Sequence, residues 1–164
     1  MGRVGLDPST FSKDHIMTII AARNGIMAGD SLYVGNGIKS YGSKIWQSED
    51  IIIGWAGNEG DCFVLRDWFL SNDKSQMPEY RLHHKDEEPS AALLVLYPDN
   101  RVEIVYSTGH VSEVISEFEA IGSGSIAAIA AMHMGADAQR AAEIACIVSD
   151  GCGGEVVTAR FRDG

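Results

Sequence analysis

Cysteine and long apolar runs are both scarce in this chain, and their scarcity excludes several classes of protein. The 164 residues include only three cysteines, and no two of them have the Cys-x-x-Cys spacing of a zinc or redox site. An odd number does not suit a disulfide framework, so we expect a reducing compartment, the cytoplasm. No apolar run approaches the length of a membrane-spanning helix, and residues 1–16 lack the apolar stretch of a signal peptide.

Positive charge is also scarce. Thirteen lysines and arginines stand against 23 acidic residues, which gives a formal net charge of −10. Nucleic acids and anionic membranes both require a basic surface, so we exclude them as partners. Glycine, by contrast, is plentiful: eighteen glycines without a Gly-X-Y period predict many tight turns and close backbone contacts.

The length of the chain suits one domain with a sizeable core. Residues 1–17 have a mixed composition, and we interpret them as an N-terminal extension: a propeptide, a mis-assigned start or residues added by cloning. Residues 18–164 form the domain. Nothing in the sequence suggests an internal repeat or a linker.

A hairpin near the start of this domain provides the first functional signal. Asn24-Gly25 separates two apolar runs, a strong hairpin signal because both residues tolerate positive φ. Counting outward from this turn places Asp30 near Thr18. A carboxylate beside a threonine on a buried hairpin is costly to keep without a use. Thr18 is therefore a candidate functional residue, although an ordinary strand threonine is the alternative.

Strands and helices are expected in separate blocks along the rest of the chain. This order predicts an α+β protein in which two antiparallel sheets pack face to face with helices outside. The expected strands are 43–46, 51–55, 91–97, 101–106, a weaker 111–118 and 155–161; the expected helices are 61–70, 125–134 and 137–148; the segments 31–39 and 72–90 are expected to be connections.

Several short motifs resemble one known family when they are taken together. They are Met17-Thr18-Ile19-Ile20, Gly29-Asp30, Ser43-Lys44-Ile45, Gly54-Trp55-Ala56-Gly57, Asp61-Cys62, Ile121-Gly122-Ser123-Gly124-Ser125 and Asp150-Gly151-Cys152-Gly153-Gly154. Their order along residues 18–161 resembles that of proteasome β-subunits and HslV-type peptidases. This resemblance implies an N-terminal-nucleophile hydrolase with a four-layer αββα sandwich.

The resemblance also implies a role for each matching residue. Thr18 would be the nucleophile, and its α-amine, once freed, would be the general base, because such amines titrate near pH ~7.7–8.0. Lys44 would lie beside the Thr18 hydroxyl, with Asp30 orienting Lys44. The remaining matches are Gly57, whose N–H would bind the oxyanion, Ser123 beside the amine or its water, and Trp55 and Glu59, which would shape a small pocket for the side chain before the scissile bond.

One segment departs from the family pattern Asp-x-x-Ser-Gly-Gly. Cys152 stands in place of the serine and Ser149 in place of the aspartate, with Asp150 displaced by one position. Either a local shift of the chain lets Asp150 take the role of the family's aspartate, or Thr18 as the terminal threonine is less well supported by this segment. No cofactor or catalytic metal is expected, although a structural monovalent cation near the Ser149–Cys152 turn is an open option.

The function implied is that of a threonine endopeptidase that hydrolyses unfolded polypeptides inside stacked rings of identical subunits, with an ATP-dependent unfoldase as a possible partner. Two alternatives remain open. One is a catalytically silent ring subunit, favoured if residues 1–17 stay attached. The other is an N-terminal-nucleophile amidohydrolase acting on a small amide. If Met17 is the true start, ordinary methionine removal exposes Thr18.

Overall fold

The computed structural model describes residues 18–80 and 88–162. The expected extension 1–17 lies outside the described residues. The strands are β1 (Ile20–Arg23), β2 (Ile26–Gly29), β3 (Leu32–Gly35), β4 (Ile38–Tyr41), β5 (Ile45–Gln47), β6 (Ile52–Gly57), β7 (Ala91–Leu96), β8 (Val102–Tyr106), β9 (Val111–Glu113), β10 (Phe118–Ile121) and β11 (Val157–Arg160); the helices are α1 (Glu59–Leu70), α2 (Ser125–His133) and α3 (Ala138–Val148).

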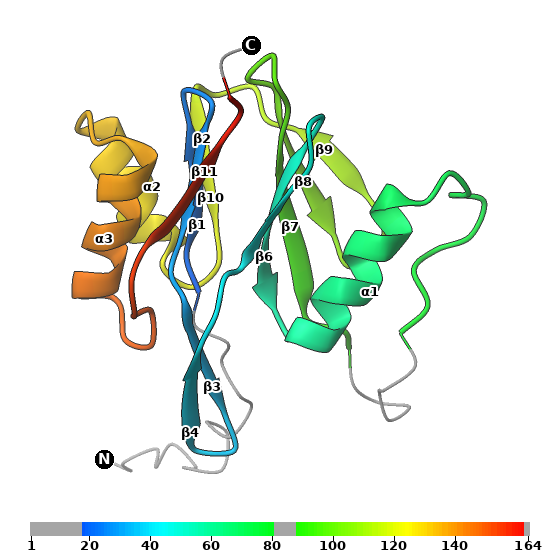
Figure 1. Cartoon of the computed structure of the whole chain (residues 1–164), viewed down its shortest axis with the longest axis horizontal. Helices are drawn as coiled ribbons and strands as arrows, with labels where there is room; N and C mark the ends of the chain where they lie inside the picture. Colours follow the sequence, from blue (N-terminus) through cyan, green and yellow to red (C-terminus); the bar gives the residue numbers. More distant parts are fainter. Residues whose placement is uncertain (1–17, 81–87, 163–164) are drawn as a thin grey trace, which may run out of the picture.

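These elements form four layers. A four-stranded sheet in the order β10-β1-β2-β11 faces a five-stranded sheet in the order β5-β6-β7-β8-β9. Helices α2 and α3 cover the outer face of the first sheet, and α1 covers the outer face of the second (Figure 1). Both sheets are antiparallel throughout, as the segregation of strands and helices predicts. The predicted αββα sandwich is confirmed.

The core divides into three clusters that lie between successive layers. Because successive strand residues point to opposite faces, Ile19 and Ala21 pack toward α2 and α3, whereas Ile20 and Ala22 pack toward the second sheet. The third cluster joins the second sheet to α1. Strand β1 is therefore buried on both faces, and Thr18 and Ile19, directly before it, are buried as well.

The first hairpin has the predicted geometry. Asn24 and Gly25 both adopt positive φ, 51° and 73°, and Ile20 lies opposite Gly29. One step further out, the Asp30 N–H donates to the Ile19 carbonyl at 3.2 Å. This register brings Asp30 to the level of residues 18 and 19, as counting from the turn predicts.

Two expectations about individual segments are wrong, one for an expected connection and one for an expected strand. Residues 31–39 are not a simple connection, because most of them belong to the hairpin β3–β4, which extends away from the sandwich (Figure 1). A second Asn-Gly pair, Asn36-Gly37 with φ of 49° and 74°, makes its turn. Residues 111–118 are not one strand: β9 ends the second sheet, and the chain then crosses to the first sheet as β10. In the described part of the chain, no helix is both long and apolar enough to cross a membrane.

Candidate active site

A buried lysine connects the threonine to the aspartate. The Lys44 Nζ donates to Thr18 Oγ1 and to Asp30 Oδ1, each at 2.9 Å. The exposed fractions are 1% for Lys44, 1% for Thr18 and 0% for Asp30. Removing two charges from water is expensive unless they are paired and hydrogen-bonded. This pair meets that condition and places a cation in direct contact with a threonine hydroxyl.

Asp30 is held by three donors from three parts of the chain. Its Oδ1 accepts from Lys44 Nζ and from the Ile19 N–H, the latter at 3.1 Å, while its Oδ2 accepts from the Gly153 N–H at 3.1 Å. Gly153 also accepts through its carbonyl from the N–H groups of residues 31 and 32. The turn after α3 is thereby tied to β2 and β3, and the carboxylate has a single orientation toward Lys44.

The main chain of Thr18 is bound on both sides by the turn between β10 and α2. Its N–H donates to Ser123 Oγ at 3.1 Å, and its carbonyl accepts from the Gly124 N–H at 3.1 Å. Gly122 has a φ of 95°, and a Cβ at this position would lie 2.2 Å from the Thr18 carbonyl oxygen, so only glycine fits. Ser123 is exposed, so the site meets solvent on the side of the Thr18 nitrogen.

An aromatic pair borders the lysine. The ring centroid of Tyr33 lies 4.9 Å from Lys44 Nζ. The Tyr33 hydroxyl donates to the Ser43 carbonyl at 3.2 Å and accepts from Trp55 Nε1 at 3.3 Å. Burial raises the pKa of Tyr33 to about 12. Trp55, 5% exposed, meets Phe63 edge to face. Tyr33 is not among the site residues that the sequence predicts. It follows Asp30 by three residues and lies in the hairpin β3–β4, within the segment 31–39 that was expected to be a connection.

Four of the predicted site residues are brought together: Thr18, Asp30, Lys44 and Ser123. Trp55 reaches this group indirectly, through the Tyr33 hydroxyl. Asp150 is exposed, and it has no hydrogen bond or ion pair among the described residues, so the structure does not bring it to Thr18. The turn it occupies uses Gly151 at a φ of 86°, and the residue that this turn directs to the site is Gly153 rather than Asp150.

Among the described residues, no hydrogen bond joins Thr18 to the other two predicted residues, Gly57 and Glu59. Gly57 ends β6 at a φ of 133°, and a Cβ there would lie 2.2 Å from the Ser90 carbonyl oxygen, so glycine is required for backbone reasons alone. Its N–H role toward an oxyanion stays a prediction. Glu59 begins α1 with an exposed side chain, and its charge is one of the minor contributions that raise the pKa of Tyr33.

A comparison with solved structures places this sandwich among known folds. The crystal structure of eukaryotic HslV from Trypanosoma brucei matches with a TM-score of 0.66 and 23% sequence identity, over 87% of this chain and 98% of that chain. The fold is HslV-like. No model of a protein family matches the sequence, and no curated protein matches it either. At this identity the likeness shows the fold, so the chemistry has to be argued from the side chains.

The thiols of this HslV-like chain do not suit a cysteine nucleophile. Burial raises the pKa of Cys62 and of Cys146 to about 12. Burial, and then the charge of Asp30, raise the pKa of Cys152, while a hydrogen bond with Ser123 acts in the opposite direction. Because the reactive form of cysteine is the thiolate, a raised pKa leaves all three thiols inert near neutral pH. Cys152 instead packs beside Ser123 as a small buried residue.

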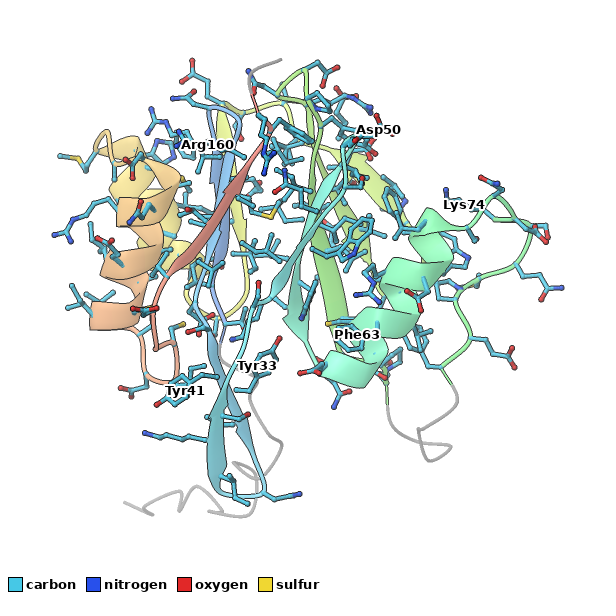
Figure 2. All side chains as sticks on the ribbon, viewed as in Figure 1. Tyr33, Tyr41, Asp50, Phe63, Lys74 and Arg160 are labelled. Atoms are coloured by element: carbon cyan, nitrogen blue, oxygen red, sulfur yellow. The ribbon has the colours of Figure 1, made fainter. Side chains whose placement is uncertain are left out.

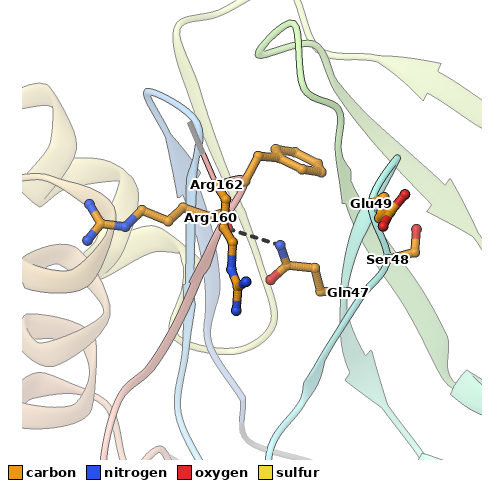
Figure 3. Close-up of a pocket in the computed structure, with 6 residues that line it drawn as sticks. Gln47, Ser48, Glu49, Arg160 and Arg162 are labelled. Carbon is orange, nitrogen blue, oxygen red and sulfur yellow. Dashed lines mark hydrogen bonds between the residues drawn. The ribbon is translucent and has the colours of Figure 1, made fainter. Parts of the chain in front are cut away.

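The described residues contain no group of three or more His, Cys, Asp or Glu side chains arranged to hold a metal ion. A structural monovalent cation near residues 149–152, which would use other oxygen ligands, stays an open option. A hollow of about 630 Å³ lies elsewhere in the HslV-like sandwich, at the end of β11 (Figure 3). Its lining contains no member of the Thr18 group; it consists of Gln47, Ser48, Glu49, Arg160, Phe161 and Arg162.

Proposed function

We propose that this chain is a threonine endopeptidase subunit of a proteasome-like particle and that it works once the residues before Thr18 are removed. The observation that supports the proposal best is the buried Lys44 ammonium that contacts both Thr18 Oγ1 and Asp30 Oδ1. A structural ion pair alone would not require a hydroxyl at the third position. A nucleophilic threonine, by contrast, gains from a nearby cation, because positive charge favours the alkoxide that forms during attack.

The first chemical step is the attack of Thr18 Oγ on the carbonyl carbon of a peptide bond. The free α-amine of Thr18 accepts the hydroxyl proton, and such an amine titrates near pH ~7.7–8.0, so it is available as a base at neutral pH. Ser123 Oγ, 3.1 Å from this nitrogen, orients the amine. Asp30, through its hydrogen bond with Nζ, keeps Lys44 directed at the hydroxyl.

The second step releases the amine product. Negative charge develops on the substrate carbonyl oxygen, and we assign the Gly57 N–H to that oxygen, where one such donor contributes about 3–4 kcal/mol. The peptide C–N bond then breaks, and the α-ammonium returns its proton to the leaving nitrogen. The ester left on Thr18 is hydrolysed by a water molecule that the same amine deprotonates, which restores the hydroxyl.

The mechanism depends on a free nitrogen at Thr18. Removal of an initiator methionine would supply it if translation starts at Met17, and cleavage of the Met17–Thr18 bond would supply it if the longer chain is made. Other parts of the proposal follow from the family resemblance: unfolded polypeptides as substrates, stacked homo-oligomeric rings, a possible ATP-dependent unfoldase and a cytoplasmic location. In the same proposal Trp55 and Glu59 shape the pocket for the residue before the scissile bond.

The test compares a chain that begins at Met17, which is processed to Thr18, with the full 164-residue chain. Intact mass gives the first residue of each protein, and a fluorogenic peptide gives its activity. We expect turnover only where the mass shows Thr18 first, and a β-lactone or epoxyketone adduct that maps to Thr18. Thr18→Ala should abolish turnover, while Thr158→Ala, at an exposed threonine of β11, should not. An active Thr18→Ala variant would refute the proposal.

A silent ring subunit is the second candidate, and one observation favours it. Asp150, the residue nearest to the family's conserved aspartate position, is exposed and unpaired among the described residues. A protein of this kind would form rings but retain residues 1–17 in the assembled particle. The silent subunit would be established over the peptidase by two results together. The intact mass of the subunits in the ring would include residues 1–17, and the inhibitor would form no adduct on Thr18.

A further inference from the structure

The hydrogen bonds of Lys44 account for two of the three N–H groups of its ammonium. A lysine ammonium has three N–H donors and no acceptor. Within the described part of the chain, Nζ makes two hydrogen bonds, to Thr18 Oγ1 and to Asp30 Oδ1. The side chain is 1% exposed, so water does not take the third N–H freely. A buried N–H without any partner would carry a desolvation cost, which makes the group facing it important.

The third neighbour is an aromatic ring. Lys44 Nζ lies 4.9 Å from the ring centroid of Tyr33, inside the roughly 6 Å range in which a cation is attracted to an aromatic face. Tyr33 belongs to β3, near the end of the β3–β4 hairpin that joins the sandwich (Figure 2). The hairpin that sequence analysis missed therefore delivers an aromatic side chain to the lysine.

The ring is fixed from its far end. The Tyr33 hydroxyl donates to the Ser43 carbonyl and accepts from Trp55 Nε1. Ser43 directly precedes Lys44, so the tyrosine is tied to the segment that carries the lysine. Trp55 is itself held by its edge-to-face contact with Phe63 at 5.5 Å. These two hydrogen bonds hold the ring with its face toward the ammonium.

We infer that Tyr33 is a positioning residue for the proposed peptidase, because its ring face takes the third direction of the Lys44 ammonium and holds Nζ against Thr18 Oγ1. The inference rests on the proposed function for its catalytic consequence. The contact itself does not depend on that function. Tyr33 touches no reacting atom in this scheme and acts only through the lysine.

The catalytic test uses the chain processed to Thr18 and a fluorogenic peptide. Tyr33→Leu removes the ring and should lower kcat on the order of tenfold, with KM changed by less than about twofold, because Lys44 acts on the chemical step. Tyr33→Phe keeps the ring face and should restore most of kcat. Tyr41→Leu, at a 67% exposed tyrosine of the same hairpin, is the matched control and should match the unsubstituted chain.

Equal loss in the leucine and phenylalanine variants would overturn the inference, since the hydroxyl and not the ring would then be responsible. So would a leucine variant with unchanged kcat. If the unsubstituted processed chain itself shows no turnover, the proposed function fails, and the contact is tested by unfolding instead.

That second measurement is a double-mutant cycle of urea unfolding on the full chain, with Tyr33→Leu, Lys44→Met and the double variant. We expect Tyr33→Leu to change the unfolding equilibrium constant on the order of tenfold more when Lys44 is present than in the Lys44→Met background. Additive effects would overturn the inference whatever the enzyme assay gives. The cycle thereby separates a wrong contact from a wrong function.

Discussion

Replacing Lys44 by methionine tests the buried triad most directly. Methionine fills much of the space of the lysine stem but removes the Nζ that donates to Thr18 Oγ1 and Asp30 Oδ1. Asp30, 0% exposed, then has no cation beside it. It retains two backbone donors, the N–H groups of Ile19 and Gly153. The variant therefore has a buried carboxylate that keeps two hydrogen bonds but has no opposite charge beside it.

The expected cost is at the lower end of the range for a broken buried ion pair. Such losses are about 3–5 kcal/mol, and the two remaining donors to Asp30 favour a value of about 3 kcal/mol. With a urea slope of about 2 kcal/mol per molar, this loss moves the unfolding midpoint down by about 1.5 M. Peptide turnover should fall to background in the same variant, because the hydroxyl loses the cation that assists its attack.

The assay is urea unfolding followed by the fluorescence of the three tryptophans at one fixed protein concentration. Lys39→Met, at an exposed lysine of β4, is the control and should change stability by less than about 0.5 kcal/mol. Adding Asp30→Asn to Lys44→Met should recover about 1–2 kcal/mol, because the uncompensated charge is gone. A loss below about 1 kcal/mol for Lys44→Met, or no recovery with Asp30→Asn, would refute the reasoning.

Three further predictions follow from single contacts. Gly57→Ala places a Cβ 2.2 Å from the Ser90 carbonyl oxygen at a φ of 133°, and thermal unfolding should show a loss of about 3 kcal/mol or more. Burial raises the pKa of Cys62 from 9.0 to about 12, so the folded protein keeps a neutral thiol in a pH range where the unfolded chain ionises it. The stability that depends on this neutral thiol is fully present below pH 9 and is lost as the pH rises toward 12, at about 1.4 kcal/mol of unfolding free energy per pH unit. This decline should be shallower in Cys62→Ala. Ser123→Ala removes the oxygen 3.1 Å from the Thr18 nitrogen and should lower kcat on the order of tenfold while unfolding changes little.

The sequence predicted the first hairpin and the approach of Asp30 to Thr18 because local chemistry and register decide both, whereas the place of Lys44 beside Thr18 was implied only by the family resemblance. Asn24-Gly25 sets the turn, the turn sets the register, and the register sets the position of Asp30. A second Asn-Gly pair, Asn36-Gly37, is also a hairpin signal. It did not lead to a predicted hairpin, because glycine and polar residues are frequent around it. With that turn recognised, Tyr33 would have been placed on a strand next to Asp30.

The contacts across layers could not be predicted from local sequence. The donor to Asp30 Oδ2 is the Gly153 N–H, 123 residues away along the chain, and it arrives only because α3 packs against β2. The family pattern left Asp150 as one option for this support, but Asp150 is exposed and the turn continues through Gly151 with a positive φ. Backbone direction in a glycine turn depends on tertiary packing, which spacing does not record.

The attachment of Thr18 and Ile19 has a consequence for any chain that starts at residue 18. New chain ends normally fray, because few contacts oppose their large conformational entropy. Here all four backbone polar groups of these two residues are hydrogen-bonded, to Ser123, Gly124 and Asp30. A terminus created at this point would remain immobilised inside the protein, with its ammonium and hydroxyl already oriented before any substrate arrives.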